Sequence, residues 1–124
     1  MIDFHNSSLI KLSKKWNDDL VAKIQPIMVD GEKIVDIYQA MRDFVIFTDK
    51  RIISANVQGI TGKKIDFTSL PYKKISVFSV ETAGVVDLDS ELDLFFEGLG
   101  KVRFEFTGKS SILEIGKLIG QFVL

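Results

Sequence analysis

The residues with the clearest potential for chemistry are four carboxylates at every second position of one short segment: Asp87, Asp89, Glu91 and Asp93. In an extended chain these four would share one face, with Leu88, Leu92 and Leu94 on the other. Such a face could bind Ca²⁺, which takes oxygen ligands, or supply an acid pair for glycoside hydrolysis. A calcium loop of the EF-hand type needs glycine at its sixth position, where this segment has Leu92. We therefore favour a polar strand face or a docking surface for a neighbouring molecule over a metal site.

Basic residues occur as three adjacent pairs in segments expected to form loops: Lys50-Arg51, Lys63-Lys64 and Lys73-Lys74. A basic residue near an anionic bilayer contributes about 1 kcal/mol of attraction. The pairs could therefore bind anionic lipid or another anionic ligand if they shared one face. We interpret them first as solvated loop residues and keep lipid or ligand contact as the alternative.

Catalytic and cofactor-binding residues are scarce in this sequence. It contains no cysteine and one histidine, His5, which excludes a disulfide framework, a thiolate zinc site, a cysteine nucleophile and a histidine-rich metal site. The segment GITGKK (59–64) has two residues between its glycines and precedes an expected strand. A phosphate-binding Walker loop needs four residues there and a following helix. We predict no catalytic residue, no metal and no cofactor.

Length and charge limit the kinds of partner. The chain has 124 residues, 46% of them apolar, which fits one globular domain. Its 16 basic and 17 acidic residues give a net charge of −1, which argues against nucleic-acid binding. Residues 1–74 carry 12 basic and 9 acidic groups, whereas residues 75–100 carry six acidic groups and no basic one. This asymmetry suits copies of the protein that meet through opposite charges, and it suits a solvated strand edge equally well.

The hydropathy of the chain bears on its location. No segment approaches the roughly 18 consecutive apolar residues of a membrane span. The N-terminal segment lacks the continuous apolar stretch of a signal peptide. We therefore expect a cytoplasmic protein, for which contact with a membrane surface is less favoured than contact with protein.

The N-terminal region, residues 1–28, has the apolar spacing of a helix. Apolar side chains at steps of three and four predict a helical arm over residues 13–28, with Trp16 on its apolar stripe. Pro26 should end or bend this helix. The main domain is then expected over residues 29–124.

The middle of the chain has the pattern of β-strands. Seven short segments rich in Val, Ile, Phe and Thr, separated by turn residues, predict strands at 34–39, 44–48, 52–56, 64–68, 75–82, 91–97 and 101–107. Strands linked mostly by hairpins imply an antiparallel meander that packs as a sandwich or small barrel.

The C-terminal segment returns to helical spacing. Ser111 with Glu114 three residues later is a capping-box signal, and the wide apolar stripe that follows predicts an amphipathic helix. We expect this helix to cover the open mouth of the barrel. Gly116 and Gly120 permit a close approach, either to the body of the domain or to another subunit.

Several motifs resemble those of the bacterial pleckstrin-homology (PH) domain family. The run RDFVIFTDKRII (42–53) resembles the family's RD-hydrophobic-T-[ND]-KR-hydrophobic pattern. Further motifs follow in the family's order: QGITGKK (58–64), PYKKI (71–75), FSVETAG (78–84) and DLDSEL (87–92). The resemblance covers residues 29–124. It implies a mainly β, PH-like barrel of seven antiparallel strands, capped by the C-terminal amphipathic helix and preceded by the N-terminal helical arm.

The resemblance also implies a partner, because members of this family are associated with ring-like homo-oligomers. Eukaryotic lipid-binding PH domains usually hold inositol phosphates with basic residues between their first two strands. Here that connection is Ala40-Met41, without a Lys-x-Arg cluster, so we do not expect that mode of recognition.

We predict a non-enzymatic PH-like module that acts through homo-oligomerisation and protein–protein interaction, with a candidate interface at Asp87, Asp89, Glu91 and Asp93. The alternative is peripheral binding of anionic lipid or another ligand through Lys50, Arg51, Lys63, Lys64, Lys73 and Lys74.

Overall fold

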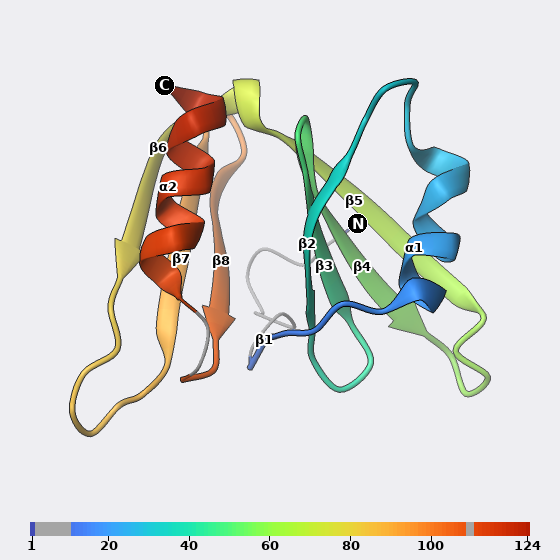
Figure 1. Ribbon diagram of the computed structural model, residues 1–124, viewed down its shortest axis with the longest axis horizontal. Helices are drawn as coiled ribbons and strands as arrows, with labels where there is room; N and C mark the ends of the chain where they lie inside the picture. Colours follow the sequence, from blue (N-terminus) through green and yellow to red (C-terminus); the bar gives the residue numbers. More distant parts are fainter. Residues whose placement is uncertain (2–10, 109–110) are drawn as a thin grey trace.

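The computed structural model describes Met1, residues 11–108 and residues 111–124, and these form two antiparallel β-sheets and two α-helices (Figure 1). The first sheet has the order β1 (Ser13–Lys14), β2 (Ile34–Gln39), β3 (Phe44–Thr48), β4 (Arg51–Gln58) and β5 (Lys64–Pro71). The second has the order β6 (Ile75–Glu81), β7 (Ser90–Phe96) and β8 (Gly100–Phe106). The helical elements are α1 (Asp18–Ile24), the 3₁₀ turns η1 (Gln25–Ile27) and η2 (Tyr72–Lys74), and α2 (Ile112–Val123).

The chain is mainly β with a C-terminal helix, as the sequence predicts; of the two packings expected for the seven strands, a sandwich or a small barrel, the described chain does not form a closed barrel. The described chain forms eight strands in two separate sheets. At one side, β5 ends at Pro71, which has no N–H to donate, and the chain turns through η2 into β6. At the other side, Leu12 links the sheets: its N–H donates to the Glu105 carbonyl and its carbonyl accepts from the Thr107 N–H, both at 2.9 Å. Residues 13–14 already pair with β2.

The predicted helical arm over residues 13–28 is also wrong in its extent, because α1 spans only Asp18–Ile24. Residues 12–15 instead hydrogen-bond to neighbouring strands; the Lys15 N–H donates to the Ile37 carbonyl at 3.0 Å. The Asn17 side chain then begins the helix by accepting from the Asp19 N–H at 2.9 Å. Trp16 lies outside the helix, is 54% exposed and donates its indole N–H to Asp18 at 3.0 Å. Its predicted place on the apolar stripe is therefore wrong.

Two apolar cores lie on opposite faces of the first sheet. One lies between the sheets and α2, and includes Phe47 and Phe104. The other lies under α1, where Leu20 and Ile24 pack against residues such as Ile46. All five residues of β3 are buried because both of its faces are covered.

The C-terminal helix lies against the three-stranded sheet, as Figure 1 shows. The Ser111 hydroxyl accepts from the Glu114 N–H at 3.5 Å, which confirms the predicted N-cap. A Cβ atom at Gly116 would lie 3.0 Å from the Val80 side chain, so this glycine serves the packing of α2 on β6. No helix in the part of the chain that the structure describes is long and apolar enough to cross a membrane.

Candidate functional site

The four predicted carboxylates divide between a loop and a strand. Asp87 and Asp89 lie in the loop between β6 and β7, and Glu91 and Asp93 lie on β7. The Asp89 N–H donates to the Asp87 carboxylate at 3.0 Å, which bends the chain before the strand begins. The four carboxylates therefore do not share one extended face, and Leu88, predicted to lie on the same face as Leu92 and Leu94, is 60% exposed while those two are buried.

Arg103 of the neighbouring strand β8 holds the two carboxylates on β7. Its guanidinium donates to both oxygens of Asp93, at 2.8 and 3.0 Å, and lies 3.3 Å from a Glu91 oxygen. The Glu81 carboxyl shares a hydrogen bond with Glu91 and, with partial burial, raises the pKa of Glu91. Among the described residues, no cluster of three or more His, Cys, Asp or Glu side chains is placed to hold a metal ion. This part of the segment forms a polar strand face.

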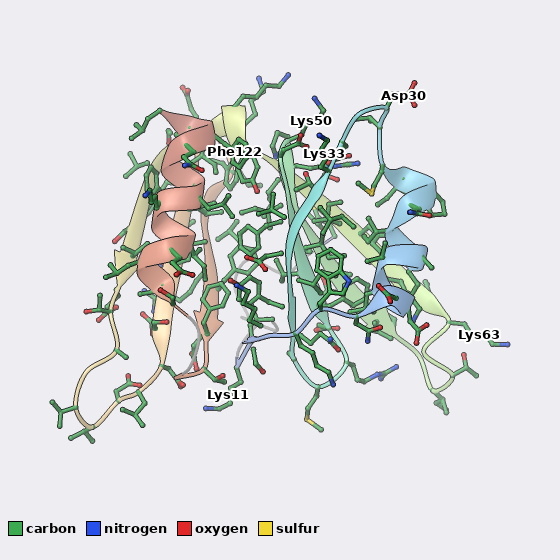
Figure 2. The ribbon with its side chains drawn as sticks, in the orientation of Figure 1. Lys11, Asp30, Lys33, Lys50, Lys63 and Phe122 are labelled. Atoms are coloured by element: carbon green, nitrogen blue, oxygen red, sulfur yellow. The ribbon has the colours of Figure 1, made fainter. Side chains whose placement is uncertain are left out.

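The valine loop, as we call residues 84–89, projects apolar side chains into solvent. The Gly84 N–H donates to the Asp87 carbonyl at 2.7 Å, which closes a tight turn with Val85 and Val86 at its tip. Both valines are 96% exposed. The base of the loop is fastened by a 3.4 Å ion pair between Asp89 and Lys11, which Figure 2 labels at the lower edge of the molecule. The loop is thus a fixed apolar tip with carboxylates beside it.

Arg51 is an internal structural residue and is not available as half of a solvated basic pair. Its guanidinium binds both oxygens of Glu32, at 3.0 and 2.9 Å, and donates to the Ile27 carbonyl at 2.6 Å. The Glu32 side chain is fully buried and accepts further hydrogen bonds from the Thr48 hydroxyl, at 2.6 Å, and from the Val29 N–H, at 3.1 Å. Burial alone would raise the pKa of Glu32, but the hydrogen bonds from Arg51, Thr48 and Val29 outweigh it and lower the pKa from 4.5 to about 2.

The Glu32 carboxylate makes the stability of the fold dependent on pH. A pKa lowered by folding stabilises the protein above the unfolded value of 4.5, and that stability is lost as the pH falls through about 2. We expect the free energy of unfolding to decrease by about 3 kcal/mol over this window from Glu32 alone. Urea midpoints measured from pH 5 to pH 2 check this, with Glu32→Gln as the control that lacks the titrating group. If the urea midpoints of the wild type and of Glu32→Gln fell equally as the pH was lowered, the lowered pKa of Glu32 would be contradicted.

The remaining polar residues of the 42–53 motif also hold the fold together. The Thr48 hydroxyl accepts from the N–H groups of Lys50 and Arg51, at 3.1 and 3.0 Å, and shapes the hairpin between β3 and β4. The Asp43 carboxylate accepts from the Val57 N–H at 2.9 Å, and Arg42 donates to the Gly59 carbonyl. Arg42, Asp43, Thr48 and Arg51 of the motif therefore serve the architecture, and Lys50 of the motif stays exposed.

The exposed lysines of the three pairs lie at two different ends of the molecule. Lys63 and Lys64 flank the end of the β4–β5 loop, while Lys50 lies at the opposite end, as the labels of Lys63 and Lys50 in Figure 2 show. Lys73 and Lys74 lie close to Lys50, because the Tyr72 N–H donates to the Lys50 carbonyl at 3.3 Å. The structure thus brings together three of the six basic residues, which we call the lysine end.

A hollow of about 680 Å³ adjoins the lysine end. It lies where β5 passes through η2 into β6 and where β7 turns into β8, and its lining is Ser69, Leu70, Pro71, Lys73, Lys74, Ile75, Ser76, Phe96, Glu97 and Leu99. Sequence reasoning identified the two lysines of this lining but missed Pro71 and Leu99. No local pattern marks these residues, since the hollow is formed by two segments, 69–76 and 96–99, that are far apart along the chain.

Comparisons with known proteins agree with this architecture. The sequence matches the family described as bacterial PH domain over residues 3–123. YjqA, an uncharacterized protein of Bacillus subtilis (strain 168), is 50% identical over 95 residues, or 75% of this chain and 76% of that relative. The crystal structure of a DUF1696 family protein with a pleckstrin-homology domain from Shewanella loihica PV-4 has a TM-score of 0.81 and 38% identity, covering 93% of this chain and 99% of that one.

A second solved structure, the pleckstrin homology domain from Shewanella amazonensis SB2B, has a TM-score of 0.70 and 37% identity and covers 90% of this chain and 92% of that one. The two sheets, the C-terminal helix and these likenesses give the protein a PH-like fold. With the family match over nearly the whole chain, they show that the protein belongs to the bacterial PH domain family.

Proposed function

We propose that this protein is a non-catalytic, cytoplasmic PH-like module that acts by self-association, with the valine loop as a contact. One observation carries the proposal: Val85, Val86 and Leu88 are 96%, 96% and 60% exposed within one short, hydrogen-bonded loop. Scattered single apolar residues on a surface are ordinary, but adjacent ones on a fixed loop are typical of an interaction site.

The charges around the valine loop favour a protein partner over a membrane. Asp87 and Asp89 lie within the loop, and Glu81 ends the strand that leads into it. The anionic surface of a bilayer attracts basic segments and repels acidic ones. A protein surface that combines an apolar patch with a basic rim matches this loop in both respects.

Ion pairs that hold the carboxylates near the valine loop support the non-catalytic part of this proposal. Glu91 and Asp93 are held by Arg103, and Asp89 by Lys11. The hollow, by contrast, contains the single carboxylate of Glu97. The chain has no cysteine and one histidine, so few groups could serve as nucleophile or general base.

The wild-type protein is expected to form a discrete assembly larger than its 14.0 kDa chain in light scattering. The double variant Val85→Asp, Val86→Asp is expected to shift the mass to that of the single chain, because docking would then press two carboxylates against the apolar surface that the valines contact. Both valines are almost fully exposed, so the fold should be unaffected.

Ile60→Asp provides the matched control, since Ile60 is an equally exposed apolar residue in a different loop. It should keep the wild-type mass. A wild-type protein that stays a single chain at high concentration would refute the proposed function. A valine-loop variant that assembles normally would refute the role of the loop.

A second candidate function is contact with an anionic surface through the lysine end. The observation that favours it is the grouping of Lys50, Lys73 and Lys74, none of which forms an ion pair with another described residue. Sedimentation with phosphatidylserine vesicles tests it. Binding at low salt that weakens as salt is raised, and that is lost in Lys73→Glu, Lys74→Glu, would support this function. No sedimentation of the wild type at low salt would remove it.

A further inference from the structure

The β6–β7 hairpin has contrasting surfaces at its two ends. The valine loop connects the end of β6 to the start of β7, whereas the hollow lies where β6 begins and β7 ends. Figure 1 shows this loop at the lower left and η2, which borders the hollow, at the top. Strands of seven residues, at about 3.3 Å per residue, place the two surfaces roughly 20 Å apart. The loop cannot reach the hollow of its own chain.

The valine loop is suited to insertion into a partner. The hydrogen bond from Gly84 to Asp87 already fixes its turn, so docking would order little additional backbone. Valine side chains have few rotamers and lose little entropy when they are buried. Leu88 lies against Gly108, where an added Cβ atom would be 3.3 Å from the Leu88 carbonyl oxygen. The loop is therefore supported from behind and presents its apolar tip outward.

The lining of the hollow complements this loop in charge and also offers apolar surface. Leu99 supplies exposed apolar surface and Pro71 half-buried apolar surface, and Lys73 and Lys74 are exposed cations beside them. Glu97 is the acidic residue of the lining. A volume of about 680 Å³ lies within the range of pockets that enclose a small ligand, roughly 300–1,000 Å³, and so accommodates the tip of a loop.

We propose that the valine loop of one copy docks into the hollow of a second copy. Val85 and Val86 would meet the apolar wall that includes Leu99, and Asp87 would approach the two lysines. This inference rests on the proposed self-association and specifies its geometry. Each copy offers one loop and one hollow at opposite ends, so the contact can repeat from copy to copy and close into a ring, or form twice in a reciprocal pair.

Two variants that each lack one of the partner surfaces test this geometry. The loop variant is Val85→Asp, Val86→Asp, and the hollow variant is Lys73→Glu, Lys74→Glu, all at exposed positions. Each variant alone is expected to have the 14.0 kDa mass of a single chain in light scattering. An equal mixture should give twice that mass and no more, because the intact hollow of one variant accepts the intact loop of the other, and no further contact remains.

The outcomes separate this inference from the proposed function. If the wild type assembles but the mixture stays at the mass of single chains, the loop and the hollow do not meet, and the inference is overturned while self-association stands. The docking inference is also overturned, and self-association again stands, if the hollow variant alone assembles as the wild type does. If the wild type remains a single chain, both are overturned. The Ile60→Asp variant should assemble like the wild type, which controls for an added charge in an exposed loop.

Discussion

Arg51→Met is expected to lower the free energy of unfolding by about 3–5 kcal/mol, as is usual when one partner of a buried ion pair is removed. The loss is large because Glu32 would keep a fully buried carboxylate without its guanidinium. Total stability of a domain is typically about 5–15 kcal/mol, so a substantial unfolded fraction is expected at moderate denaturant. Urea unfolding followed by circular dichroism measures the change.

The double variant Glu32→Leu, Arg51→Met should be more stable than Arg51→Met alone, because it removes the unpaired charge as well. Arg103→Met is the matched control. Its guanidinium also binds carboxylates, but the side chain is 39% exposed, and we expect a loss of about 1 kcal/mol or less. If Arg51→Met cost no more than Arg103→Met, the internal role of Arg51 would be contradicted.

Leu12→Ala is expected to cost about 2–5 kcal/mol, the range for leucine truncation in a core. Leu12 is fully buried and its backbone links the two sheets through Glu105 and Thr107. The substitution leaves those backbone hydrogen bonds possible but opens a cavity between the sheets. Thermal and urea unfolding of the variant measure the loss.

Leu113→Ala is the control for this prediction, because Leu113 lies on α2 and is 65% exposed. The same side-chain truncation there should change the free energy of unfolding by about 0.5 kcal/mol or less. A Leu12→Ala variant as stable as Leu113→Ala would show that residues 11–14 do not join the sheets in solution.

The strands and the C-terminal helix could be predicted from local patterns. The predicted segments 34–39 and 44–48 coincide with β2 and β3, because short runs of β-branched and aromatic residues bounded by turn residues are signals that act over a few positions. Ser111 likewise marked the start of α2 correctly. The segment around Leu12 could not be predicted in this way, since its partners lie on β2 and β8, far along the chain. Its apolar spacing therefore suggested a helix that long-range pairing prevents.

The candidate site shows the same division between local and long-range information. The acidic character of residues 87–93 is visible in the sequence, but the turn that exposes Val85 and Val86 is not. Arg51 looked like half of a solvated pair because its partner, Glu32, is 19 positions earlier. The hollow depends on the meeting of segments 69–76 and 96–99, which requires the arrangement of both sheets.

The most direct measurement of the docking contact is a disulfide formed between two copies. The chain contains no cysteine, so a Val86→Cys copy and a Leu99→Cys copy each carry one thiol. A disulfide needs Cα atoms roughly 4.4–6.8 Å apart, so oxidation of the mixture should join the two copies only if the loop enters the hollow. We predict a covalent heterodimer on a non-reducing gel, confirmed by mass spectrometry, and none when Ile60→Cys replaces Val86→Cys. Failure of the first pair to link, or equal linking of both pairs, would contradict the account.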